Sequence, residues 1–98
     1  MDVPSSITMT DESVMIYPSP ASDRVMVSVV EPGAVGQTEN NYTLSIFDVS
    51  GKLLMDQKIE LTPMNRIHSI NVDWLSSGVY FFKIQGTNGI VTKKVAKG

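Results

Sequence analysis

The sequence predicts an all-β fold, a seven-stranded antiparallel β-sandwich of the Ig-like type. Apolar and polar residues alternate with a period of two in one segment after another, which is the pattern of half-buried strands. The segments are short, and residues that favour turns separate them at roughly ten-residue spacing, as in sandwiches of two packed sheets. No long segment has the apolar period of a helix. A β-barrel is the alternative architecture, and it is disfavoured because two strand junctions are rich in proline.

Length and composition fit one folded domain. The chain has 98 residues, and hydrophobic residues make up 42% of them, which suits a single hydrophobic core. Residues 1–13 are polar, acidic and aperiodic, so they predict a linker or arm. Residues 14–98 carry every strand pattern and therefore form the predicted sandwich.

The first two predicted strands lie on either side of a proline-rich turn. Val14–Tyr17 is a short apolar run that stops at Pro18 and Pro20. Proline fixes φ and has no backbone N–H, so this first strand is expected to be peripheral. Arg24 to Val30 then alternates cleanly, with valines on one face and polar residues or methionine on the other.

The next two strands form a hairpin. Tyr42, Leu44 and Ile46 share one face of the third strand, which follows a loop rich in Gly, Gln, Thr and Asn. The segment Asp48–Lys52 predicts a tight turn, since Asp can bond the following backbone and Gly51 can adopt a positive φ. Lys52 to Leu61 forms the returning strand, with an irregularity where three apolar residues in a row break the alternation.

Three more strands complete the pattern. After a turn at residues 63–66, His68, Ile70 and Val72 share a face, with Trp74 two residues further on. Val79–Ile84 has the most strand-like composition in the chain, and its alternation points Tyr80 inward and Phe81 outward. An Asn-Gly turn precedes the last strand, Ile90 to Lys97.

The residue inventory argues against an enzyme, a metal site and a cofactor site. The chain has no cysteine and one histidine, His68, so thiol catalysis, cysteine-ligated metals and multi-histidine metal sites are excluded. No Gly-x-Ser-x-Gly elbow or Gly-rich phosphate loop is present. We therefore expect His68 to have a structural role and the domain to be non-catalytic.

The net charge argues against nucleic acid as a partner. The distribution of charge makes the last strand the basic part of the chain. The net charge is −2, whereas phosphate binding needs a concentrated positive field. Residues 1–23 carry acids and no Lys or Arg, while residues 74–98 carry four lysines and no acid. The basic segment favours an acidic partner, and alternation places Lys93 and Lys94 on opposite faces. Edge strands also allow the domain to pair with a copy of itself.

Aromatic residues leave a second class of function open. Trp74, Phe81 and Tyr42 are the side chains that would form a stacking platform in a glycan- or surface-binding accessory module, because exposed aromatic rings mark contact sites. Phe81 is the clearest of them, since its neighbour Tyr80 points into the core.

Four blocks of the sequence resemble the type A C-terminal sorting domain of the type IX (Por) secretion system. Tyr17-Pro18-Ser19-Pro20-Ala21 resembles the opening block of that family, with Ser19 where the family most often has Asn; either residue can bond neighbouring backbone in a turn. The other blocks are the Asp48-x-x-Gly51-Lys52 hairpin, the segment around Gly78 and Tyr80, and the lysine-containing terminal segment.

The resemblance implies a transport signal. Such a domain sits on a larger secreted enzyme or adhesin of Gram-negative Bacteroidota, is read in the periplasm by the outer-membrane translocon, and is removed by a sortase-like peptidase as the cargo reaches the cell surface. The implied recognition element is the terminal block Lys93, Lys94, Val95, Ala96, Lys97 and Gly98. The implied cleavage region is the linker before Val14. Met1 without a signal peptide would then reflect excision from the cargo.

Overall fold

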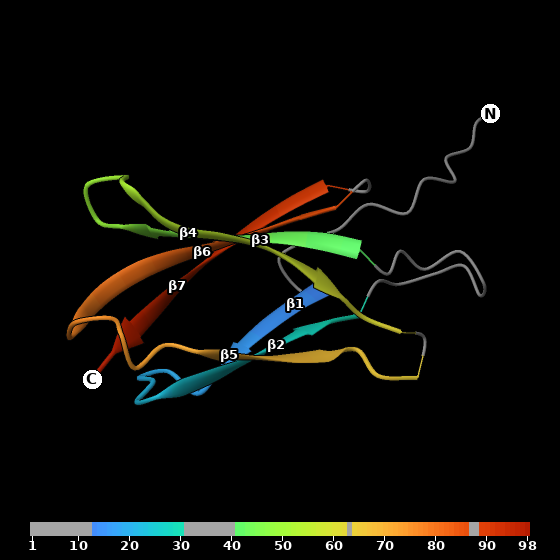
Figure 1. Cartoon of the computed structure of the whole chain (residues 1–98), viewed down its shortest axis with the longest axis horizontal. Helices are drawn as coiled ribbons and strands as arrows, with labels where there is room; N and C mark the ends of the chain where they lie inside the picture. Colours follow the sequence, from blue (N-terminus) through green and yellow to red (C-terminus); the bar gives the residue numbers. More distant parts are fainter. Residues whose placement is uncertain (1–12, 31–40, 63, 87–88) are drawn as a thin grey trace.

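The computed structural model describes residues 13–30, 41–62, 64–86 and 89–98. Within these ranges the chain forms seven strands in two antiparallel sheets that lie face to face (Figure 1). One sheet has the strand order β1-β2-β5 and the other β4-β3-β6-β7. The strands are β1 (Val14–Tyr17), β2 (Arg24–Val29), β3 (Asn41–Asp48), β4 (Leu53–Glu60), β5 (Ile67–Asn71), β6 (Gly78–Gly86) and β7 (Gly89–Lys97).

The predicted all-β sandwich is confirmed, and the short first strand β1 lies at a sheet edge as expected. The predicted β3–β4 hairpin is present, and the strand order shows what the sequence left open: β6 pairs with β3, so the β5 sheet has three strands and the β3 sheet has four. The Ig-like relationship stays a prediction. The predicted loop before Asn41, the linker at residues 1–12 and the Asn-Gly turn before β7 fall mainly outside the described residues.

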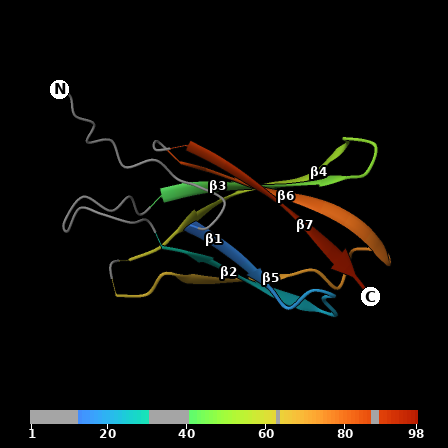
Figure 2. The same ribbon diagram turned by 180° about the vertical axis from the view of Figure 1, so that it is seen from behind.

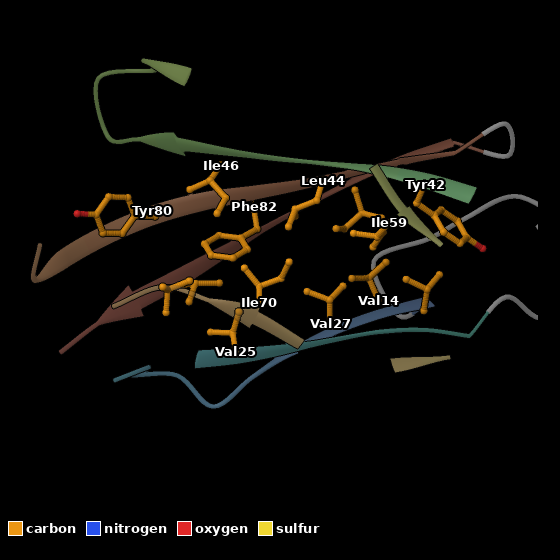
Figure 3. Packing of buried hydrophobic residues seen from close by; sticks show 14 of the residues in the cluster. Val14, Val25, Val27, Tyr42, Leu44, Ile46, Ile59, Ile70, Tyr80 and Phe82 are labelled. Atoms are coloured by element: carbon orange, nitrogen blue, oxygen red, sulfur yellow. The ribbon is translucent and has the colours of Figure 1, made fainter. Parts of the chain in front are cut away.

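The core lies between the two sheets and is built by the period-two alternation. Val25, Val27 and Val29 of β2 are fully buried, and Leu44 and Ile46 of β3 face them from the other sheet (Figure 3). Phe82 of β6 is the largest fully buried side chain. Burial of apolar area of this kind is the main favourable term in folding. The remaining core residues are Val14, Ala21, Tyr42, Ile59, Leu61, Ile70, Val72, Leu75, Tyr80, Ile84, Val91 and Val95.

The side chain of Arg66 joins the two sheets at the end where β3 begins. Its Nε donates to the carbonyl oxygen of Val29 at 3.0 Å, and its Nη2 donates to the Tyr42 hydroxyl at 2.8 Å. The guanidinium also lies 5.7 Å from the centre of the Tyr42 ring, within the range of a cation–π contact. The buried Tyr42 hydroxyl is thus satisfied, as a polar group in a core must be.

Two details of the fourth and fifth strands test the sequence prediction. The irregularity expected near the start of β4 is present, because the β3–β4 register shifts between Ile46 and Phe47. The alternation in β5 ends at Asn71, so Trp74 does not continue the inward face. Trp74 lies in the following turn, is 48% exposed, and donates its indole N–H to the Asn71 carbonyl at 2.9 Å.

The hairpin turn between β3 and β4 has the hydrogen bonds that its sequence predicts. The Asp48 carboxylate accepts from the Ser50 hydroxyl at 2.6 Å, the Ser50 amide at 2.9 Å and the Lys52 amide at 3.0 Å. Gly51 has a φ of 90°, a region that side chains disfavour. The hydrogen bonds from Ser50 and Lys52 lower the pKa of Asp48 below its ordinary 3.8.

We expect Asp48→Asn to lower the urea midpoint of unfolding at neutral pH. A carboxylate whose pKa is lower in the folded state stabilises that state above its ordinary pKa of 3.8, and the stabilisation is lost as pH falls below this value. The difference between wild type and variant should therefore shrink in urea titrations at acid pH. Asp73→Asn, in another exposed turn, is the matched control. An unchanged difference down to acid pH would contradict the role of the carboxylate.

Candidate functional site

The end of β7 is held by the proline-rich turn that follows β1. The Ala21 amide donates to the Ala96 carbonyl at 2.8 Å, and the Gly98 amide donates to the Ala21 carbonyl at 2.8 Å. The Ala96 amide donates to the Ser19 hydroxyl oxygen at 3.2 Å. Ala21 is 2% exposed. We call this set of contacts between residues 19–21 and 96–98 the β7 clamp.

Ser19 has a long-range partner in this clamp. The expectation from the sequence was a hydrogen bond to neighbouring backbone within the turn. Its hydroxyl instead accepts from Ala96, which lies 77 positions further along the chain. The opening and terminal blocks of the sequence therefore form one structural unit.

The segment before β6 is hydrogen-bonded to the end of β7, beside the β7 clamp. The Lys97 ammonium donates to the Leu75 carbonyl at 2.8 Å, and the Tyr80 hydroxyl donates to the Ser76 carbonyl at 2.7 Å. Gly78 is the direct partner of Lys97 in the β6–β7 ladder. The third block of the family pattern is thus in contact with the fourth.

All four blocks lie at one end of the sandwich. Tyr17 ends β1, Asp48 ends β3, Gly78 begins β6 and Lys97 ends β7. Asp48 is the cross-strand partner of Tyr80, which in turn is the partner of Val95. Figures 1 and 2 show the β3–β4 hairpin, the start of β6 and the end of β7 together at the end marked C. The blocks occupy alternate chain reversals, and in an antiparallel fold alternate reversals fall at the same end.

The lysines of β7 are not equivalent. Val95 is buried, and Lys93 shares its inward face, is half-buried and has an interaction partner. Lys94 projects from the opposite face and is exposed. Lys97 is half-buried and bonded to Leu75. The predicted inequivalence of Lys93 and Lys94 is confirmed, and Lys94 is the most accessible of the three lysines.

The three aromatic side chains of the alternative function do not lie on one surface. Tyr42 is 2% exposed and lies in the core (Figure 3). Phe81 is half-buried on the outer face of its sheet, beside its cross-strand partner Phe47. Trp74 is exposed in the β5–β6 turn. A stacking platform that needs all three rings is therefore absent from this part of the chain.

His68 is half-buried at the side of the sandwich. Its Nε2 lies 3.5 Å from the Gln57 amide nitrogen, and its cross-strand partner is the buried Val27. Among the described residues, no cluster of three or more His, Cys, Asp or Glu side chains has the geometry to hold a metal ion. In the same residues no helix is long and apolar enough to cross a membrane.

Fold and site together define a small β-sandwich with its four motif blocks at one end. The chain belongs to the family described as the secretion system C-terminal sorting domain, which it matches over residues 15–97. It is therefore a non-catalytic targeting domain, a signal for type IX secretion that interacts with the secretion machinery and serves a cargo domain. Its cargo is exported to the cell surface or beyond. No curated protein matches the chain.

Proposed function

We propose that the translocon reads this domain at the clamped end of the sandwich, with the terminal block Lys93–Gly98 as the recognition element. The observation that supports this most is the gathering of all four motif blocks around the end of β7. A shared pattern of core residues would be spread through both sheets, whereas these blocks lie at one end of the sandwich. Lys94 is the exposed lysine of the terminal block, since Lys93 and Lys97 are half-buried, and it is the residue of that block most suited to contact an acidic partner.

We propose the rest of the sorting cycle from the resemblance to the family. In the periplasm the folded domain docks to the outer-membrane translocon of a Bacteroidota cell. A sortase-like peptidase then cuts in the region before Val14, and the new end of the cargo is joined to anionic lipopolysaccharide at the surface. The position of Val14 supports this assignment, because it begins an edge strand and is fully buried, so cleavage upstream of it leaves the sandwich intact.

The test is export of a fused reporter. The domain is joined to a periplasmic reporter in a strain that has the secretion system, and residues 95–98 are removed. We expect the truncated fusion to stay in the periplasm. Undiminished export would refute the assignment of the terminal block. Because Val95 is buried and residues 96–98 form the β7 clamp, folding of the truncated fusion is checked by protease resistance.

Single charge reversals separate recognition from folding. Lys94→Glu changes an exposed side chain, so we expect export to fall by about tenfold with unchanged thermal stability. Lys58→Glu is the matched control, because Lys58 is exposed on β4 at the opposite edge of the same sheet. Lys93→Glu is expected to destabilise the fold as well, since Lys93 is half-buried and has a partner. Equal export of the Lys94 and Lys58 variants would show that Lys94 is not part of the recognition element.

A further inference from the structure

Strand β7 forms an edge of the four-stranded sheet, and among the described residues the outward backbone groups are hydrogen-bonded at its C-terminal end. The Ala96 amide and carbonyl bond to Ser19 and Ala21, so they point away from β6. Backbone groups of every second residue point the same way in an antiparallel strand. The amides and carbonyls of Ile90, Thr92 and Lys94 are therefore directed outward along the same edge. We call this stretch, residues 90–94, the open edge of β7.

No described strand pairs with the open edge. The sheet order places β7 beside β6 alone, and the β7 clamp begins only at Ala96. Ile90 is 54% exposed, and Thr92 and Lys94 are exposed as well. In Figure 2 the β7 ribbon runs along the border of its sheet, with β1 in the other sheet. Outward N–H and C=O groups of this kind are a template for another strand.

The charge of the β6–β7 hairpin indicates what kind of strand can pair with the open edge. The hairpin carries four lysines and no acidic residue. Lys97 is bonded to Leu75, while Lys94 is exposed directly at the open edge. Pairing with β7 of a second copy would place lysines of the two edges close together, and like charges across strands are unfavourable. An acidic strand complements the edge, and unlike a lipid head group it supplies both the donors and the acceptors of a β-ladder at the right spacing.

We propose that the open edge of β7 pairs with an extended acidic segment of a partner protein, which becomes a fifth strand of the β3 sheet. This inference rests on the proposed function, since it specifies how the terminal block is recognised. Backbone hydrogen bonds supply affinity in strand addition, and side chains supply specificity. The segment carries Asp or Glu opposite Lys94 and an apolar residue opposite Ile90. Its pairing stops before Ala96, because Ser19 and Ala21 occupy the backbone there.

Thr92→Pro tests the backbone pairing. The Thr92 amide points away from β6, so proline removes one donor from the open edge without removing a β6–β7 hydrogen bond. Thr92→Val is the matched control, because it keeps the amide and the branched shape. Thermal melts establish that both variants fold. Lys94→Glu then tests whether the positive charge at the open edge attracts the acidic segment.

The binding probe is a short synthetic peptide with a glutamate and a valine four positions apart on the same strand face, to lie opposite Lys94 and Ile90. We expect it to shift the amide resonances of Ile90, Thr92 and Lys94 saturably, and the same peptide with lysine for glutamate to leave them unchanged. Thr92→Pro and Lys94→Glu should each weaken binding by about tenfold or more, and Thr92→Val should bind like wild type. Shifts at another edge strand, equal binding by Thr92→Pro, or the same shifts on concentrating the domain alone would overturn the proposal.

The export assay keeps this inference distinct from the proposed function. Loss of export in both the 95–98 truncation and Thr92→Pro, with normal export of Thr92→Val, supports strand addition. Normal export of Thr92→Pro beside failed export of the truncation refutes strand addition and leaves the terminal block as the signal. Normal export of the truncation and of Thr92→Pro refutes both strand addition and the assignment of the terminal block as the signal.

Discussion

Phe82→Ala is expected to lower the free energy of unfolding by about 3–5 kcal/mol, the usual cost of truncating a fully buried phenylalanine. Phe82 is 1% exposed and is the largest fully buried side chain among the described residues. Its strand β6 lies between β3 and β7, where Phe82 is paired with Ile46 and Lys93. A cavity here would loosen the packing between β6 and both neighbouring strands. Small domains have a total stability of only about 5–15 kcal/mol, so we expect a large unfolded fraction near physiological temperature.

Phe81→Ala is the matched control for Phe82. Phe81 is the next residue in β6, has the same side chain, and points to the outer face of the sheet, where it is half-buried. Truncation of Phe81 is expected to lower the free energy of unfolding by about 1 kcal/mol. Urea titrations measure the free energy of unfolding of both variants. They are followed by the fluorescence of Trp74, the one tryptophan of the chain. Equal costs for the two variants would mean that the outer face is packed as tightly as the core.

Ala21→Asp is expected to release the end of β7. Ala21 is 2% exposed, and its amide and carbonyl hold Ala96 and Gly98. A carboxylate has no partner at this buried position, and burial of an unpaired charge is among the most destabilising changes a single substitution makes. We expect a loss of about 3 kcal/mol in the free energy of unfolding. Because the opening turn and the terminal block form one unit, export should fall with it.

Amide hydrogen exchange distinguishes release of the strand end from general destabilisation. In Ala21→Asp the amides of Ala96 and Gly98 should exchange at least about tenfold faster than expected from the change in global stability. Ser22→Asp is the matched control, since Ser22 is the exposed neighbour of Ala21, and exchange at both amides should stay as in the wild type. Unchanged exchange at Ala96 and Gly98 in Ala21→Asp would show that the clamp is not what orders the end of β7.

The predictions from sequence succeeded where a local rule governs the structure. The valines of β2 and the aromatic residues of β6 are buried in strict alternation, because a half-buried strand needs only a period of two. The Asp48 turn formed as expected because its hydrogen bonds join residues four positions apart or fewer. The alternation of β5 does not reach Trp74 because the strand ends at Asn71, and nothing in the alternation of the preceding residues marks that end.

The candidate site was found only in part. The resemblance selected four blocks that the structure places at one end of the sandwich, yet it treated the opening turn and the terminal strand as separate features. Contacts between Ser19 and Ala96 join residues 77 positions apart, and no local pattern encodes such a pair. The signal available was the placement of the blocks at alternate chain reversals, which puts them at one end of any fully antiparallel sandwich.

By itself, the sequence determined the strands, the inward face of each, the turn at Asp48 and the absence of cysteine chemistry, since these depend on neighbouring residues and on composition. The tertiary structure alone decided that β6 joins β3, that β7 lies at an edge, and that Lys94 is exposed while Lys93 and Lys97 are partly buried. The physical reason is that an edge, a clamp and a charged surface arise from which strands become neighbours. That choice is made by packing two sheets around one core, and it joins residues from opposite ends of the chain.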